Sequence, residues 1–296
     1  MIEIAINCRI SYQDLARKTG LSATAVKNRV TALLDIGAIS RFSISLNAAM
    51  INAEHFLAVV ITDGTEDIDE FVGMMGANPM VGHISLLASA GGSAYLFWGQ
   101  YIGSTMLSQL RTFLHEPPEV VNVELHTILW KIGKKMNLAK LHLRILAVLK
   151  KNPRALINDI ANETDLAPKT VRRALRELME GDGIQFSSRP DMAAGKLVNF
   201  YVRFEWDEDE TKLEDVVKWL QEKYALELWD PTISATEPII FAEFVVENLH
   251  EAEKIARDIR SVEFVKSTAT LVSYSNLKFT YLAETMLDDL IREAGY

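Results

Sequence analysis

The chain has little of what marks several large classes of protein. Its 296 residues include one cysteine, Cys8, so no disulfide can form within the chain. No apolar run approaches the roughly 18 residues that a membrane-spanning helix needs. The N-terminal residues lack the basic start and the small-residue cleavage site of a secretory signal. We therefore expect a cytoplasmic protein with no membrane partner.

Motifs of common catalytic and cofactor sites are also missing from the sequence. It contains no Gly-x-Ser-x-Gly, no phosphate-binding Gly-x-x-x-x-Gly-Lys-Ser/Thr and no Gly-x-Gly-x-x-Gly. The six histidines show neither His-x-x-x-His spacing nor pairing with cysteine, so a metal site is not indicated. We predict no catalytic residues, no metal and no cofactor, and we expect the protein not to be an enzyme.

Acidic residues outnumber basic ones, which gives a net charge of -9, but the basic residues are unevenly distributed along the chain. Residues 9–42 carry six Lys/Arg and two Asp, whereas residues 48–130 carry one Arg and nine acids. The alternation repeats, because residues 131–190 carry thirteen Lys/Arg and six acids, and residues 197–296 carry ten and twenty-one. Two basic segments separated by acidic ones predict two phosphate-binding modules in one acidic chain.

The sequence repeats itself with a period of 145 residues. Arg9 aligns with Arg154, Asp14 with Asp159, and Thr19 with Thr164. A period this long is too large for a solenoid and indicates duplication of a two-domain module. Each copy opens with a pattern typical of a winged helix-turn-helix, namely two short amphipathic helices, a tight turn and a first wing strand. In the first copy the helices are 12–18 and 23–35, with Ser22 as an N-cap, and the strand is 39–44.

The second copy adds a helix at 138–149, followed by helices at 156–163 and from Pro168 onward, and a wing strand from Ile184. After each winged helix, alternating segments predict strand, helix, two strands, helix and strand, which is a ferredoxin-like arrangement. The segments in the first copy are 55–62, 66–76, 80–89, 94–101, 103–115 and 119–130. Those in the second are 197–206, 211–224, 226–235, 239–247, 249–260 and 263–274.

This order, together with the runs Arg9-Ile10-Ser11-Tyr12-Gln13-Asp14-Leu15-Ala16 and Gly20-Leu21-Ser22-Ala23-Thr24-Ala25-Val26-Lys27-Asn28-Arg29-Val30, resembles the Lrp/AsnC family of transcription regulators. The second copy matches more loosely, with Asp165 and Ala167 where the family has Gly and Ser. The resemblance implies an α+β fold in which two winged helix-turn-helix domains alternate with two ferredoxin-like RAM domains. The predicted divisions are 1–47 (a winged helix with a truncated first helix), 48–131 (RAM), 132–196 (winged helix), 197–274 (RAM) and 275–296 (a C-terminal amphipathic helix).

The family implies double-stranded DNA as partner, read by the second helix of each helix-turn-helix. Short polar groups suit base edges there, and cations suit phosphates or guanine. Arg29 has an alternative role, an ion pair that braces the wing. A solvated helix face with no DNA contact is the other interpretation. The predicted DNA contacts are Ser22, Thr24, Lys27, Asn28, Arg29, Thr31 and wing residue Arg41 in the first copy, and Lys169, Thr170, Arg172, Arg173, Arg176 and wing residue Arg189 in the second.

The family also implies a small-molecule effector, such as an amino acid, at the turn between the second and third RAM strands. The candidate residues are Gly91, Gly92 and Ser93, but the acid of the family's Gly-x-x-Asp is Ala94 here, and the second copy has Ala235-Thr236-Glu237-Pro238. The glycine pair fits a tight hairpin equally well. The resemblance further implies that the RAM domains pair, as an internal pseudo-dimer, within a monomer, a homodimer or a larger assembly.

Two other functions remain open at this point. Siroheme decarboxylases resemble the same two-domain architecture, and the chain could also be a protein-interaction module that has lost its DNA contacts. The C-terminal segment from Leu282 aligns, at the same offset of 145, with the helix at 138–149. Two alternatives follow: residues 282–294 pack on the last RAM domain, or, as a hypothesis, they dock on a winged helix and complete the first one.

Overall fold

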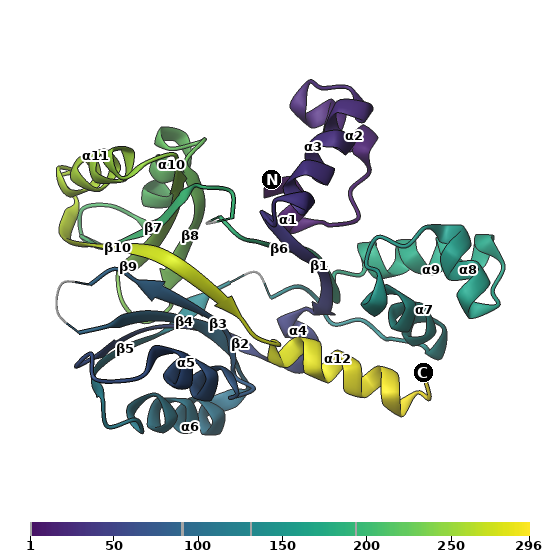
Figure 1. The fold of residues 1–296 in the computed structure, drawn as a ribbon, viewed down its shortest axis with the longest axis horizontal. Helices are drawn as coiled ribbons and strands as arrows, with labels where there is room; N and C mark the ends of the chain where they lie inside the picture. The colour runs from purple at the N-terminus through teal and green to yellow at the C-terminus, as the bar shows by residue number, and fades with distance from the viewer. Residues whose placement is uncertain (1, 90–91, 131, 193) are drawn as a thin grey trace. The chain divides into compact units, whose positions relative to one another are not determined.

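The computed structural model describes residues 2–89, 92–130, 132–192 and 194–296, which divide into two compact units. One unit comprises Met1–Ala53, Ile132–Gly195 and Ala283–Tyr296, and holds both winged helices. The other comprises Glu54–Lys131 and Lys196–Leu282, and holds both ferredoxin-like halves. The predicted α+β class, with winged helix-turn-helix and ferredoxin-like parts, is confirmed (Figure 1).

The winged-helix unit contains the expected helices in both copies. Its elements are α1 (Ile2–Ile6), α2 (Tyr12–Thr19), α3 (Ala23–Asp35), β1 (Ile39–Leu46), α4 (Ala48–Ile51), α7 (Lys140–Lys151), α8 (Ile157–Thr164), α9 (Pro168–Glu180), β6 (Ile184–Pro190) and α12 (Leu282–Glu293). The helical spacing of apolar residues explains the packing. In the first copy Leu15, Val26 and Val30 form one core with Ile4 and Ile39.

The two strands expected to begin separate wings pair with each other instead. β1 and β6 form a two-stranded antiparallel sheet, in which Ile44 lies opposite Phe186 and Arg41 lies opposite Arg189. Moving both residues of one pair by 145 positions, Ile44 to Arg189 and Phe186 to Arg41, gives the other pair, so the pairing has approximate two-fold symmetry. Each strand supplies backbone donors and acceptors to the other. Neither strand therefore needs a hairpin partner along the edge at which the two strands meet.

The C-terminal helix α12 belongs to the winged-helix unit, one of the two alternatives, but it does not complete the first winged helix. Lys150 of α7 pairs with Asp288 of α12 at 2.9 Å, so α12 lies along the second copy. The core of the first winged helix, in the described part of the chain, contains no residue of α12. The short α1 packs against β6 and supplies Ile4 to that core.

The second unit is built from eight strands that close into one sheet. Its elements are β2 (Glu54–Thr62), α5 (Ile68–Gly76), β3 (Val81–Leu87), β4 (Ala94–Tyr101), α6 (Gly103–His115), β5 (Val120–Leu129), β7 (Val198–Trp206), α10 (Leu213–Lys223), β8 (Leu228–Ser234), β9 (Ile239–Val246), α11 (Leu249–Arg260) and β10 (Val265–Lys278). The strand order is β10-β3-β4-β2-β5-β8-β9-β7. Each half therefore keeps its own four-stranded order and joins the other half at two seams.

The two seams differ in length. β10 pairs with β3 from Ser273 to Lys278, whereas the described pairing of β5 with β8 covers Ile128 and Leu129, with one more backbone hydrogen bond from Ala235 to Thr127. The longer seam explains why β10 continues to Lys278, beyond the strand end at residue 274 that the sequence predicts. A pairing partner distant in the sequence stabilises these last residues as strand.

Alternate residues of the strands divide between an outer and an inner core. On β2, Phe56, Ala58 and Val60 pack beneath the helices, whereas Leu57 and Val59 face the inside of the closed sheet. The inner core also contains Leu96, Tyr201 and Phe241. This division follows from the two-residue period of a strand, because neighbouring side chains point to opposite faces.

Two carboxyl groups lie directly opposite each other on the inner face of the second half. Asp230 of β8 pairs in register with Glu243 of β9, and Glu243 lies opposite Tyr201 on β7. Asn199 Nδ2 donates to Glu243 Oε1 at 2.7 Å. Burial, together with the negative charge of the neighbouring Asp230, raises the pKa of Glu243 to about 7. Burial likewise raises the pKa of Asp230 to about 6.

We predict that Glu243 makes the unfolding free energy depend on pH in the neutral range. Its pKa is higher in the folded protein, so its contribution is complete below the unfolded value of about 4.5. This contribution is lost as the pH rises through about 7, and it amounts to about 3 kcal/mol at most. Urea unfolding of wild type at a series of pH values should show the decline, and Glu243→Gln should reduce its slope. The exposed Glu263→Gln is the control, and an equal slope in Glu243→Gln and wild type would contradict the prediction.

Candidate nucleic-acid interface

The first helix-turn-helix has both expected turn signals. Ser11 caps α2 by accepting a hydrogen bond from the backbone of Asp14, and Gly20 ends that helix in the left-handed conformation, with φ of 68°. Ser22 then caps α3, because its Oγ accepts from the backbone N–H of Ala25 at 3.1 Å. These contacts fix the angle at which α3 leaves the turn.

The second helix-turn-helix reaches the same geometry with different residues. Asp165 takes the place of Gly20 and has φ of 49°, a conformation that short polar side chains tolerate. Ala167 takes the place of Ser22 with an extended backbone but no side-chain cap, and Pro168 begins α9. The residues that depart from the family pattern therefore change how the turn is stabilised and leave its path intact.

The predicted contacts on the two recognition helices lie on exposed faces. On α3 the inward residues are Val26 and Val30, and on α9 they include Val171 and Leu178. Thr170 is partly buried, and the remaining predicted positions on and next to these helices are exposed. Exposed are Ser22, Thr24, Lys27, Asn28, Arg29 and Thr31 on the first, and Lys169, Arg172, Arg173 and Arg176 on the second.

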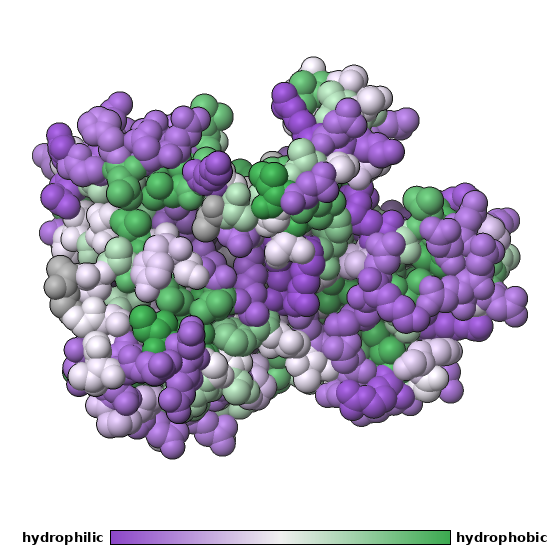
Figure 2. Space-filling view, viewed as in Figure 1, coloured by the Kyte–Doolittle hydropathy of each residue, from purple (hydrophilic) through white to green (hydrophobic). Residues whose placement is uncertain are grey.

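The two exposed faces differ in charge. Lys27 and Arg29 are the cations of α3, and within the described residues no ion pair joins Arg29 to the wing strand. The α9 face carries four cations, of which Arg173 pairs with Glu177 at 3.5 Å. In Figure 2 hydrophilic residues cover much of the visible face of α8 and α9. The second recognition helix therefore has the greater capacity for phosphate.

The wing residues do not lie as the sequence predicts. Arg189 is buried, with 8% of its side chain exposed, and it forms an ion pair with Glu284 of α12. Glu284 also lies 3.6 Å from Arg41, whose side chain is 55% exposed. The expectation that Arg189 contacts DNA is therefore wrong for this arrangement, because its guanidinium is enclosed by a partner that the sequence places 95 residues away. Arg41 keeps an exposed surface.

Two arginines that sequence reasoning left without a role connect the winged helices reciprocally. Arg9 donates to the carbonyl oxygens of Pro153 at 2.5 Å and Ala155 at 3.0 Å. Its repeat counterpart Arg154 donates to those of Cys8 and Ile10, the second at 3.5 Å. The alignment of Arg9 with Arg154 was the available signal, but only the packed structure shows that each residue binds the other copy.

The candidate effector turn lies partly outside the described residues, because Gly91 is not among them. Gly92 has φ of 74°, and a Cβ there would lie 2.1 Å from the carbonyl oxygen of Thr62. The carbonyl of Ser93 accepts from the backbone N–H of Thr62 at 2.9 Å. Close backbone packing thus accounts for Gly92, and effector binding at this turn stays a prediction.

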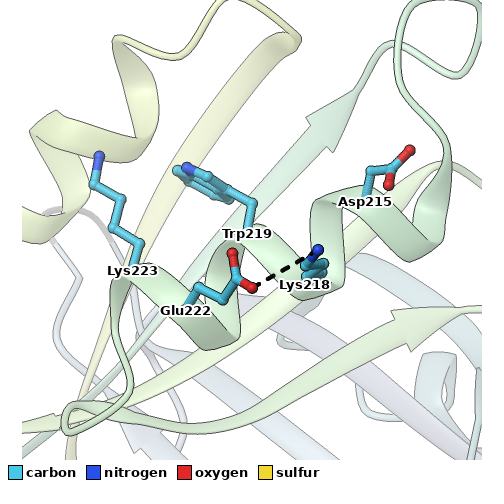
Figure 3. A pocket seen from close by; sticks show the side chains of 5 residues that line it. All are labelled: Asp215, Lys218, Trp219, Glu222 and Lys223. Atoms are coloured by element: carbon cyan, nitrogen blue, oxygen red, sulfur yellow. Dashed lines mark ion pairs between the residues drawn. The ribbon is translucent and has the colours of Figure 1, made fainter.

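A small surface hollow lies elsewhere, along α10 (Figure 3). Its lining residues come from this single helix, and Lys218 pairs there with Glu222 at 3.8 Å. Trp219 packs edge-on against Tyr224 and Phe264, so its ring belongs to the local core. Lys223 approaches Trp219 and pairs with Asp258 at 2.8 Å. Lys218, Glu222 and Lys223 thus have charged partners within the protein.

Family models match the two helix-turn-helix segments. Residues 2–34 match the AsnC-type helix-turn-helix domain, and residues 138–182 match a winged helix-turn-helix DNA-binding model. The predicted resemblance to Lrp/AsnC regulators is confirmed, and the chain contains two helix-turn-helix domains of DNA-binding type. No curated protein matches the chain.

The solved structures with a similar fold include that of an enzyme, and this match extends over the whole chain. Siroheme decarboxylase NirDL is 15% identical, with a TM-score of 0.59, and the match covers 100% of this chain and 97% of that one. The same decarboxylase in complex with an iron-uroporphyrin III analogue is 14% identical, with a TM-score of 0.59, covering 99% and 97%. E. coli AsnC is 15% identical, with a TM-score of 0.38, covering 47% of this chain and 94% of that chain.

The expectation that the protein is not an enzyme is corrected by the decarboxylase match. That expectation relied on missing motifs and on an architecture taken as typical of regulators, yet an enzyme has the same architecture from end to end. Within the described residues no helix is both long enough and apolar enough to cross a membrane.

The missing cap at α9 yields a prediction about stability. Ala167→Ser should raise the unfolding free energy by about 1 kcal/mol, because the serine hydroxyl can accept from an unpaired N–H in the first turn. The backbone already has the extended conformation of a capping residue, with φ of -64° and ψ of 138°. Urea unfolding followed by circular dichroism measures the gain. Ser22→Ala, the matched control, should lose a similar amount, and a stability loss in both variants would contradict the prediction.

Proposed function

We propose that this protein is a DNA-binding transcription regulator of Lrp/AsnC type, duplicated within one chain. One observation carries the proposal, namely two exposed recognition helices joined through a nearly two-fold symmetric strand pair. Such an arrangement presents two helices to one duplex, as in a regulator dimer. The RAM halves would then form an internal pseudo-dimer, and an effector such as an amino acid would act through the second unit.

The two recognition helices, α3 and α9, carry different side chains, so we infer a DNA site without dyad symmetry. Thr24 offers a short hydroxyl and Asn28 an amide for base edges, with Asn28 suited to adenine, and Lys27 adds a cation. Lys169, Arg172 and Arg173 offer cations for phosphate and guanine. Helix α3 would contribute more to base discrimination, and helix α9 would contribute more to affinity.

Selection of bound sequences from a random pool of double-stranded DNA tests the proposal. We expect enrichment of a bipartite site whose two halves differ in sequence. Enrichment of a perfect palindrome would contradict the inferred asymmetry, and the absence of any enriched sequence would contradict the proposed function itself.

A variant that removes two positive charges tests the role of the second recognition helix, α9. The Arg172→Ala/Arg173→Ala variant should reduce the slope of log affinity against log salt concentration by roughly one to two units, because each phosphate contact contributes about 0.9. Fluorescence anisotropy with a labelled duplex at several salt concentrations measures this slope. Lys218→Ala/Lys254→Ala, on exposed helix faces of the other unit, is the matched control, and an equal fall in both variants would show non-specific attraction.

A second candidate function is that of a siroheme-decarboxylase-like enzyme, which the whole-chain match favours. A tetrapyrrole substrate carries several carboxylates, for which cations are the natural partners. On the inner face of the closed sheet, Arg203 is held by Glu124 at 2.5 Å, so a substrate would have to displace an existing ion pair. Absorbance titration of the purified protein with siroheme tests this candidate. A saturable spectral change followed by loss of carboxylate carbon as CO2 would support it, and an unchanged spectrum would exclude it.

A further inference from the structure

Two arginines face each other across the strand pair that joins the winged helices. Arg41 of β1 and Arg189 of β6 occupy opposite positions in the antiparallel register. Like charges directly opposite each other in a sheet destabilise the pairing. Because Arg189 is buried, water screens this repulsion poorly.

A single carboxylate from the C-terminal helix interacts with both arginines. Glu284 Oε1 pairs with Arg189, and Glu284 Oε2 lies 3.6 Å from Arg41 Nη2. The side chain of Glu284 is only 7% exposed, so the interaction with Arg189 is a buried ion pair. Removing one partner of a buried pair leaves an uncompensated charge, whereas replacing both partners is often tolerated.

Helix α12 holds this carboxylate in place through contacts at both sides of Glu284. Ala283, Leu287 and Ile291 are buried on one face of the helix. One turn further on, Asp288 pairs with Lys150 of α7 at 2.9 Å. The residue that neutralises the wing strands therefore comes from a segment that follows the last strand of the other unit.

The position of each recognition helix depends on the register of this strand pair. Only residues 36–38 separate α3 from β1, and only residues 181–183 separate α9 from β6. A register slip by one residue would move one strand along the other by about 3.3 Å. The rise of DNA is about 3.4 Å per base pair, so a slip of one residue corresponds to roughly one base pair.

We propose that Glu284 is a positioning residue that fixes the separation of the two recognition helices, and so selects the spacing between the two halves of the DNA site. This inference rests on the proposed DNA-binding function for its consequence, but the separation itself can be measured without DNA. The carboxylate acts by neutralising Arg41 and Arg189 near one end of the strand pair, next to the register shift between Ile39 and Arg41.

Distance measurement by electron spin resonance between two spin labels tests the positioning directly. Leu34→Cys on α3 and Met179→Cys on α9 are repeat-equivalent positions, both are exposed, and neither belongs to the predicted DNA contacts. The natural Cys8 is buried and stays unlabelled. We expect one narrow distance distribution in the otherwise wild-type protein and a broad one in Glu284→Gln. Asp289→Asn is the matched control, since Asp289 is an acid of α12 that pairs locally with Arg292.

The double variant Glu284→Gln/Arg189→Gln tests whether Glu284 positions the helices through its charge or only through its packing. It removes both members of the buried pair and should restore a narrow distribution. A narrow distribution in Glu284→Gln alone, or a broad one in the double variant, would overturn the proposal. If Glu284→Gln does not fold, a folded double variant with a narrow distribution supports the proposal, and an unfolded double variant overturns it.

Binding to DNA probes of varied spacing then tests the functional consequence. Wild type and Asp289→Asn should prefer one spacing by about tenfold over a probe with one added base pair. Glu284→Gln should bind a single half-site as tightly as wild type does. On probes with two halves it should bind both spacings about equally. A preserved spacing preference in Glu284→Gln would overturn the proposal. Failure of wild type to bind any probe would refute the proposed function, and the label distances would still decide whether Glu284 positions the helices.

Discussion

The antiparallel pairing of β1 with β6 is the contact on which the arrangement of the two recognition helices depends. It replaces two separate wings by one shared sheet, so that each winged helix completes the hydrogen bonding of the other. Arg9 and Arg154 reinforce the pairing, because each donates to backbone carbonyls of the opposite copy. A guanidinium suits this role because it presents several donors in a fixed plane.

The duplication allowed the two copies to diverge while they kept this shared frame. A homodimer must present two identical recognition helices, but here α3 carries two cations and α9 carries four. The same freedom is visible in the second unit, where β10 pairs with β3 over a long seam and β5 pairs with β8 over a short one. It also allowed the acids Asp230 and Glu243 to occupy the inner face of the second half only. Their counterparts in the first half are His83 and Trp98, according to the strand alignment.

Helix-turn-helix segments of DNA-binding type and a whole-chain fold match to a decarboxylase occur together here, so this architecture does not by itself fix a function. The chemistry on each surface must decide. The recognition helices are exposed and basic, which favours DNA, while the inner face of the closed sheet contains the buried His126 and the half-buried Arg203. His126 lies 3.0 Å from Glu124, which also holds Arg203. These groups satisfy one another in the described structure, as buried polar groups generally must.

The sequence by itself determined the local elements and their order. Helix and strand periodicity, the Ser22 cap, Pro168 at the start of α9 and the 145-residue repeat all rest on interactions between near neighbours, which the sequence displays directly. Only the tertiary structure decided which distant segments meet. The partner of β1, the burial of Arg189 by Glu284, the extension of β10 to Lys278 and the reciprocal contacts of Arg9 and Arg154 join residues separated by about a hundred positions or more. No local pattern specifies such partners, because many basic residues could equally face solvent, DNA or a carboxylate, and packing selects among them.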